Sequence, residues 1–241
     1  MSMQRRPRES LSSYALPVES TPSMAQIFTR SADTWFRLVL LGVFGGVALL
    51  FVLCFWFARS DYATGVGWTV NQPVPFSHEH HVGGLKIDCR YCHSSVETSA
   101  VATIPPTQTC MTCHSQLWTG AEVLKPIRQS FAQNTPIQWN RVAKLADYVY
   151  FHHDIHVKAG VGCVECHGHV ETMALMRRDK PLQMQECLNC HRDPAPRLRP
   201  RQFITDMTWT TQQDRRELGE RLMREYHIDT SGLTSCSVCH R

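Results

Sequence analysis

The chain has 241 residues, a net charge of +4 and 43% hydrophobic residues. This length allows one or two domains, and a mildly basic chain without a basic, aromatic-interleaved patch is not typical of nucleic-acid binding. Many of the apolar residues lie in one early run, so the remainder is too polar for an ordinary hydrophobic core. Outside that run we expect short helices and long loops.

The N-terminal part predicts a membrane anchor. Residues 1–37 are polar and rich in arginine, proline and serine, which predicts an irregular arm. Residues 38–58 are uninterruptedly apolar, long enough to cross a bilayer and too long for a signal peptide. Arginines crowd the N-terminal flank, so we expect a single-pass protein of the cell (inner) membrane with a cytoplasmic N-terminus. Residues 59–75 are expected to form a linker, and the rest to lie on the periplasmic or extracytoplasmic side.

The pattern C-x-x-C-H occurs five times and uses ten of the eleven cysteines. This is the attachment signature of c-type haem, because the two thiols bind the porphyrin while the histidine faces the iron. Structural zinc or disulfides would not explain why histidine follows every pair. Five large apolar porphyrins would also supply the missing core. The predicted haem-binding residues are Cys89, Cys92 and His93; Cys110, Cys113 and His114; Cys163, Cys166 and His167; Cys187, Cys190 and His191; and Cys236, Cys239 and His240.

A second pattern, F-x-H-x-x-H, stands upstream of the first and third haem motifs, and its two copies are 75 residues apart. An electron-transfer haem needs a second axial ligand, and histidines at i and i+3 share one helix face. We therefore predict four further iron ligands: His78, His81, His153 and His156. His80 and His152 fall outside the shared pattern and are interpreted as surface residues or as neighbours that contact the ligands.

Two further helices are expected in the polar part. Apolar spacing predicts one over residues 139–150 and an amphipathic one over residues 214–226. The internal repeat divides the chain into a first dihaem module over residues 76–144 and a second over 145–197. Residues 198–241 then form a C-terminal segment with the fifth haem.

The doubled histidine pairs resemble those of small multihaem cytochromes of the c7 and c3 type. This resemblance implies that His78 and His81 serve the first and second haems, and that His153 and His156 serve the third and fourth. It also implies a further ligand just upstream of the second motif of a module. That place holds Met184 in the second module, and Thr107 and Gln108 in the first. We expect Met184 to bind the fifth haem opposite His240, with His227, His169 and Met173 as competitors.

Taken together, the span, the five motifs and the closing Cys-Ser-Val-Cys-His-Arg resemble the pentahaem membrane-anchored subunit of alternative complex III. The fold class implied is a multihaem cytochrome c: one transmembrane helix plus a low-secondary-structure α/loop domain around five haems. The resemblance implies electron transfer from quinol to a monohaem cytochrome c or another acceptor. The implied partners are an iron–sulfur protein, polytopic membrane subunits, the monohaem cytochrome and membrane lipid.

Two other functions remain open at this stage. A catalytic multihaem enzyme would need an iron with an open position, and no lysine-ended motif suggests one. A stand-alone single-span quinol dehydrogenase feeding a periplasmic reductase also has one N-terminal span, but that class carries four haems.

Overall fold

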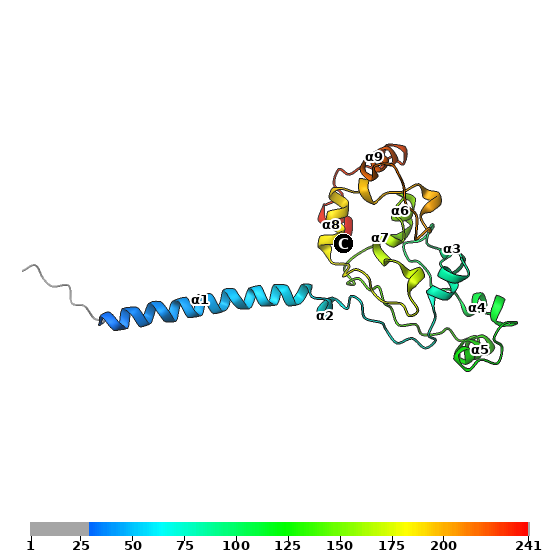
Figure 1. The fold of residues 1–241 in the computed structure, drawn as a ribbon, viewed down its shortest axis with the longest axis horizontal. Helices are drawn as coiled ribbons and strands as arrows, with labels where there is room; N and C mark the ends of the chain where they lie inside the picture. Colours follow the sequence, from blue (N-terminus) through cyan, green and yellow to red (C-terminus); the bar gives the residue numbers. More distant parts are fainter. Residues whose placement is uncertain (1–28, 241) are drawn as a thin grey trace, which may run out of the picture. The chain divides into compact units, whose positions relative to one another are not determined.

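The computed structural model describes residues 29–240 and divides the chain into two compact units, Met1–Phe55 and Trp56–Arg241. Helix α1 (Arg30–Arg59) is a single continuous helix (Figure 1). Its apolar side chains are exposed. By length and composition it is a candidate membrane span. It includes the expected residues 38–58 and begins eight residues earlier. Most of the predicted arm, residues 1–28, lies outside the described residues.

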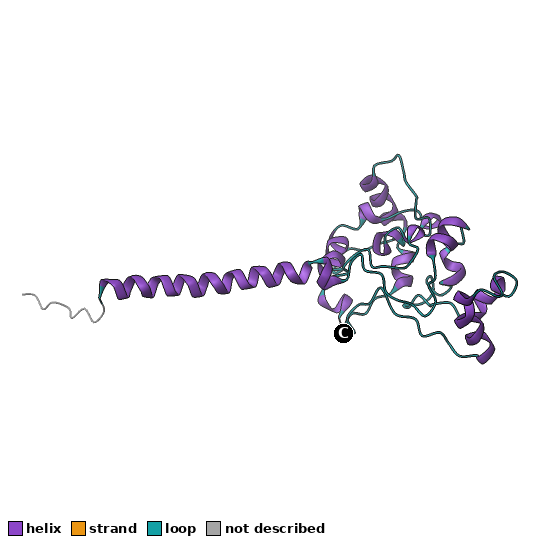
Figure 2. Cartoon of the chain, turned by 60° about the horizontal axis from the view of Figure 1, so that its bottom comes forward, coloured by secondary structure: helices purple, strands orange, loops and turns teal. Residues whose placement is uncertain are grey.

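The second unit consists of short helices joined by long loops (Figure 2). Pairing between extended segments is limited to isolated bridges within residues 29–240. The predicted mixture of helix and loop is therefore confirmed, whereas the module boundaries stay a prediction. The α-helices are α2 (Asp61–Thr64), α3 (Cys89–Cys92), α4 (Thr107–His114), α5 (Lys125–Gln133), α6 (His153–Lys158), α7 (Val164–His167), α8 (Met184–Arg192), α9 (Arg215–Glu225) and α10 (Cys236–Cys239). The π-helical turn is η1 (Glu79–Gly84), and the 3₁₀ turns are η2 (Glu122–Leu124), η3 (Val170–Thr172), η4 (Ala195–Arg197) and η5 (Arg201–Phe203).

Three small apolar clusters stand in place of one core. Their buried centres are Val74, Leu124 and Ile127; Val170, Met173 and Met207; and Leu198, Leu218 and Leu222. Each is too small to order a domain of this size by itself. The arrangement fits a chain that packs round large apolar prosthetic groups.

The amphipathic helix expected over residues 214–226 is confirmed as α9. Its N-cap, Asp214, accepts hydrogen bonds from the amides of Arg216 and Glu217. Leu218 and Leu222 are buried on one face. Gly219 lies so close to the carbonyl of Ala195 that an added Cβ would clash, which allows α9 to pack tightly on η4.

The helix expected over residues 139–150 is wrong: the segment runs as turns and extended chain. Its carbonyl groups are engaged elsewhere, because the guanidinium of Arg178 donates to the carbonyls of Val142 and Lys144. The Asn140 amide likewise donates to the Gln72 side chain. These long-range bonds replace the i to i−4 bonds of a helix.

Helix α5 was not expected from the sequence. Pro126 stands in its first turn and Asn134 ends it in the left-handed conformation, at φ 50°. It buries Ile127 and Ser130, and Ser130 shares a hydrogen bond of 2.6 Å with Thr107 of α4. This contact holds α5 against the second haem motif.

Candidate haem sites

In each motif the two cysteines lie one helical turn apart, on α3, α4, α8 and α10, and at the N-cap and within α7 for Cys163 and Cys166. In the first, third and fifth motifs, where the histidine ends or follows the turn, its amide donates back to the carbonyl of the first cysteine, for example from His93 to Cys89 over 2.8 Å. All the cysteines are free thiols. This geometry presents two thiols and one imidazole from a single turn, as attachment to one porphyrin requires. Within residues 29–240 no group of three or more His, Cys, Asp or Glu side chains could hold a metal ion by itself.

The predicted ligand histidines share one hydrogen-bonding pattern. In seven of them the ring Nδ1 lies 2.7–3.2 Å from a backbone carbonyl. A carbonyl only accepts, so Nδ1 is the donor and Nε2 stays free to bind a metal. The pairs are His81 with Ser77, His93 with Thr103, His114 with Leu117, His153 with Ala100, His156 with His152, His191 with Leu233 and His240 with Tyr148.

Three upstream histidines face the histidine of a haem motif. The ring centres are 6.2 Å apart for His81 and His114, 6.4 Å for His153 and His167, and 6.1 Å for His156 and His191. Two imidazoles bound on opposite sides of one metal, each through a bond of about 2 Å, have ring centres roughly 6 Å apart. The spacing therefore fits an iron between each pair, and it matches the pairing that the c7 and c3 resemblance implies.

The fourth upstream histidine, His78, lies near His93 of the first motif. Burial, together with repulsion from His93, His81 and His167, lowers the pKa of His78 to about 4. Its Nδ1 is buried without a hydrogen-bond partner. Burial also lowers the pKa of His167 to about 4. Both rings are thus neutral near pH 7, the form that binds a metal.

A phenylalanine orders each upstream pair. The Phe76 ring stacks on His81 at 4.4 Å and meets His78 edge-on at 4.9 Å. In the second copy, Phe151 stacks on His156 at 4.5 Å and meets His153 edge-on at 4.8 Å. Sequence reasoning recorded this phenylalanine as part of the pattern without giving it a role.

The fifth motif contacts the segment that contains Tyr148 and Tyr150, and its expected second ligand is exposed. His240 donates to the Tyr148 carbonyl, and the Tyr150 amide donates to the carbonyl of Cys239. Met184, the expected second ligand, lies at the start of α8 with 63% of its surface exposed.

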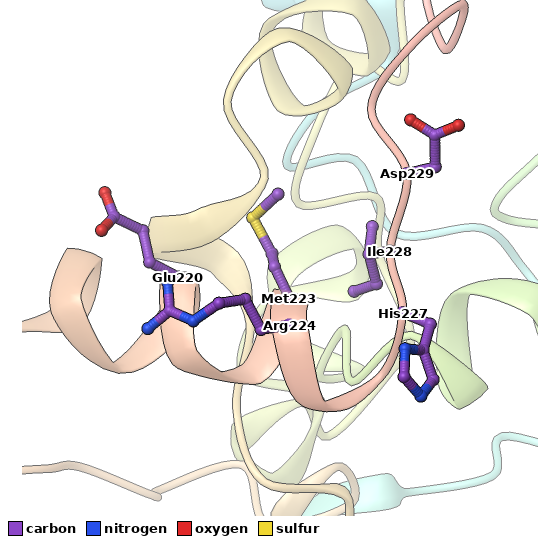
Figure 3. Close-up of a pocket in the computed structure, with 6 residues that line it drawn as sticks. All are labelled: Glu220, Met223, Arg224, His227, Ile228 and Asp229. Carbon is purple, nitrogen blue, oxygen red and sulfur yellow. The ribbon is translucent and has the colours of Figure 1, made fainter.

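The competitors of Met184 differ in environment. Met173 is completely buried in an apolar cluster, so it is a core residue. The His169 ring pairs with Glu171 at 2.8 Å. His227 lines an open surface pocket of about 500 Å³ together with Met223 and Arg224 (Figure 3).

The cysteine side chains reveal the spatial order of the motifs. The thiols of Cys89 and Cys163 lie close enough to interact, and this interaction lowers the pKa of Cys89 and raises that of Cys163. Burial raises the pKa of Cys92, and neighbouring Cys110 adds to the rise. The first motif therefore lies between the second and the third.

The third, fourth and fifth motifs extend this spatial order. Burial raises the pKa of Cys166 to about 11, with Cys190 and Cys187 adding to the rise. Burial and then Cys239 raise the pKa of Cys187. The motifs thus follow one another in the order second, first, third, fourth, fifth.

The five motifs and the facing imidazoles are typical of multihaem c-type cytochromes. The chain is similar to the multiheme cytochrome c subunit of menaquinone reductase from Nitratidesulfovibrio vulgaris (strain Hildenborough). The two are 27% identical over 175 residues, which cover 70% of this chain and 77% of the relative. No protein-family model matches the chain.

Proposed function

We propose that this chain is the electron-transfer subunit of a membrane quinol or quinone oxidoreductase complex and holds five covalently bound haems. The observation that carries this proposal is the set of three imidazole pairs with ring centres 6.1–6.4 Å apart, each beside a C-x-x-C-H turn. The similarity to a multiheme cytochrome subunit supports it.

The protein's own residues fix, orient and space the haems. The paired cysteines anchor each porphyrin, and the backbone carbonyls hold the ligand imidazoles in one orientation. Cysteines of neighbouring motifs lie close enough to shift each other's pKa, which supports one continuous series of attachment points. When bound, haem iron supplies one-electron chemistry by cycling between its ferric and ferrous forms. Facing imidazoles at the second, third and fourth motifs leave no open iron position there, which suits a relay better than a substrate-binding centre.

The sixth ligand of the fifth haem is proposed to be Met184. Its position three residues before Cys187 and its exposure on α8 support this assignment. A methionine opposite His240 would raise the potential of that haem above those with two histidines.

We propose that α1 anchors the chain with its N-terminus in the cytoplasm and its haem domain (Trp56–Arg241) outside. The proposed partners are an iron–sulfur protein, polytopic membrane subunits and a monohaem cytochrome c. Purification of the chain from its native membrane in mild detergent, with mass spectrometry, tests this assembly. Companions of these kinds support it; a chain that emerges alone and oxidises quinol supports the stand-alone dehydrogenase instead.

The direction of electron flow has two candidates. Resemblance to alternative complex III favours quinol oxidation, whereas the relative's name favours quinone reduction. Mixing the purified complex with a menaquinol analogue, and separately with a reduced monohaem cytochrome c, distinguishes them. For quinol oxidation we expect the haem α-band to appear rapidly with the menaquinol analogue. Rapid haem reduction by the cytochrome, followed by loss of menaquinone, supports the other direction.

A further inference from the structure

Three arginines converge on one carboxylate inside the third haem motif. Glu165 stands between Cys163 and Cys166 and pairs with Arg197 at 3.2 Å, Arg199 at 3.3 Å and Arg215 at 3.5 Å. Arg197 and Arg199 belong to the segment after the fourth motif, and Arg215 begins α9. The cluster therefore joins three parts of the haem domain.

The cluster extends from the buried Arg199 to the exposed Arg197. Side-chain exposure is 3% for Arg199, 17% for Glu165, 34% for Arg215 and 48% for Arg197. The indole of Trp209 lies 5.2 Å from the guanidinium of Arg199 and 5.0 Å from that of Arg215. The Nε of Arg199 is buried without a hydrogen-bond partner. Cation–π contacts thus supplement an incomplete set of hydrogen bonds.

The cluster carries surplus positive charge. Within residues 29–240 the ion pairs of these three arginines all go to Glu165, so one negative charge faces three positive ones. Burial lowers the pKa of Arg215; Glu165 opposes this effect, and Arg199 and Arg197 add to it. Charges in such a partly desolvated site act strongly on their neighbours.

The charged groups adjoin two haem motifs. The guanidinium of Arg199 occupies the space where a side chain on Gly162, the residue before Cys163, would lie. Arg197 follows His191 of the fourth motif by six residues and pairs with Glu165 of the third, so its charge lies between the two motifs. The first and second motifs have no comparable cluster among the described ion pairs.

We propose that the Glu165–Arg197–Arg199–Arg215 cluster raises the reduction potentials of the haems attached at the third and fourth motifs. A ferric haem carries one more positive charge than a ferrous one, so nearby cations favour the reduced form. The inference rests on the haem attachment of the proposed function. Because haems of higher potential are reduced first, electrons in the series should occupy the third and fourth haems preferentially.

The test compares two variants of the full-length protein. Arg197→Gln removes a positive charge from the cluster, and Glu165→Gln removes its negative charge. Potentials are measured by spectroelectrochemical titration with electron paramagnetic resonance, after the haem content is counted. Arg197→Gln should lower the potential of at least one haem, and Glu165→Gln should raise it. A tenfold change in the reduction equilibrium corresponds to about 59 mV for one electron.

Arg221→Gln is the matched control, because Arg221 is an exposed arginine of α9 bonded to Gln213 outside the cluster. It should leave every potential unchanged. Shifts of the same sign in both cluster variants would indicate general disruption and overturn the inference. Unchanged potentials in variants that carry all their haems would overturn this inference but not the proposed function. Wild-type protein without covalently bound haem would overturn both.

Discussion

The two copies of F-x-H-x-x-H place their imidazoles alike on different backbones. In both, the phenylalanine is edge-on to the first histidine at 88° and stacked on the second, within 30°. In both, the Nδ1 of the second histidine donates to the carbonyl four residues earlier, over 2.8 Å in one and 2.7 Å in the other. The first copy nevertheless forms the π-helical turn η1, and the second forms α6.

The difference shows that local ring packing, rather than helix type, sets the direction of the imidazoles. The backbone instead follows what lies against it. Gly83 of η1 lies against the backbone carbonyl of Glu171 in η3, where a side chain would clash. The corresponding position in the second copy is Lys158, whose side chain is exposed and pairs with Asp154.

The largest effect, a change in the spin state of one haem, is expected when the second histidine of either F-x-H-x-x-H copy is removed. His81→Ala and His156→Ala each delete an imidazole that faces a motif histidine across about 6 Å. Each variant should convert one haem, about one fifth of the total, from low spin to high spin. Electron paramagnetic resonance of the oxidised protein measures this change.

The neighbouring histidines provide the controls. His80→Ala and His152→Ala, outside the shared pattern, should leave all haems low-spin. A low-spin His156→Ala protein would contradict the assignment in the second copy alone.

A second test exploits the position three residues before the second motif of each copy. It holds Thr107 at the start of α4, buried and bonded to Ser130, and Met184 at the start of α8, exposed. Met184→Ala should lower the potential of the fifth haem or make it high-spin, because a thioether ligand is lost. Thr107→Val should leave every potential and spin state unchanged. An unaltered redox titration of Met184→Ala would exclude this ligand and favour His227.

The packing of the first copy predicts a smaller effect on stability. Gly83→Ala should lower the free energy of unfolding by about 1–3 kcal/mol, because the new Cβ meets the Glu171 carbonyl. At Gly84 the nearest atom to an added Cβ is 3.7 Å away, so Gly84→Ala should change stability by less than about 0.5 kcal/mol. Denaturant unfolding compares the two, and equal values would mean that η1 does not depend on this close approach.

The smallest effect is expected on stability at low pH and concerns Asp88, the residue before the first haem motif. The corresponding residue before the third motif is Gly162. The Arg90 side chain lowers the pKa of Asp88 from 3.8 to about 2, and Thr205 also donates to it. A lowered pKa contributes stability above the unfolded value, and this contribution is lost as pH falls from about 4 towards 2. Asn still caps a helix, so Asp88→Asn isolates the charge.

Melting temperatures measured from about pH 6 down to pH 2 should therefore show Asp88→Asn below wild type at the upper end. The gap should close as Asp88 becomes protonated. A gap that stays constant with pH would attribute the effect to capping alone.

Patterns in the sequence predicted those elements and sites that depend on residues close together in the chain. The span, α9, the motif turns and the paired histidines all follow from spacing within a few residues. The helix over residues 139–150 was wrong because Arg178, far away in sequence, binds its carbonyls. The order of the motifs and the arginine cluster also depend on long-range contacts, although the alternating Arg197, Arg199 and Arg201 were visible in the sequence.

The backbone carbonyls that accept from seven of the proposed ligand imidazoles have one more consequence. A carboxylate in that position would take up a proton when the charge on the iron changes, whereas a carbonyl cannot. In the proposed relay, these ligands therefore carry electrons without accompanying protons. Protons exchanged with the quinone would then remain at the membrane partners, and the potentials of these haems should vary little with pH.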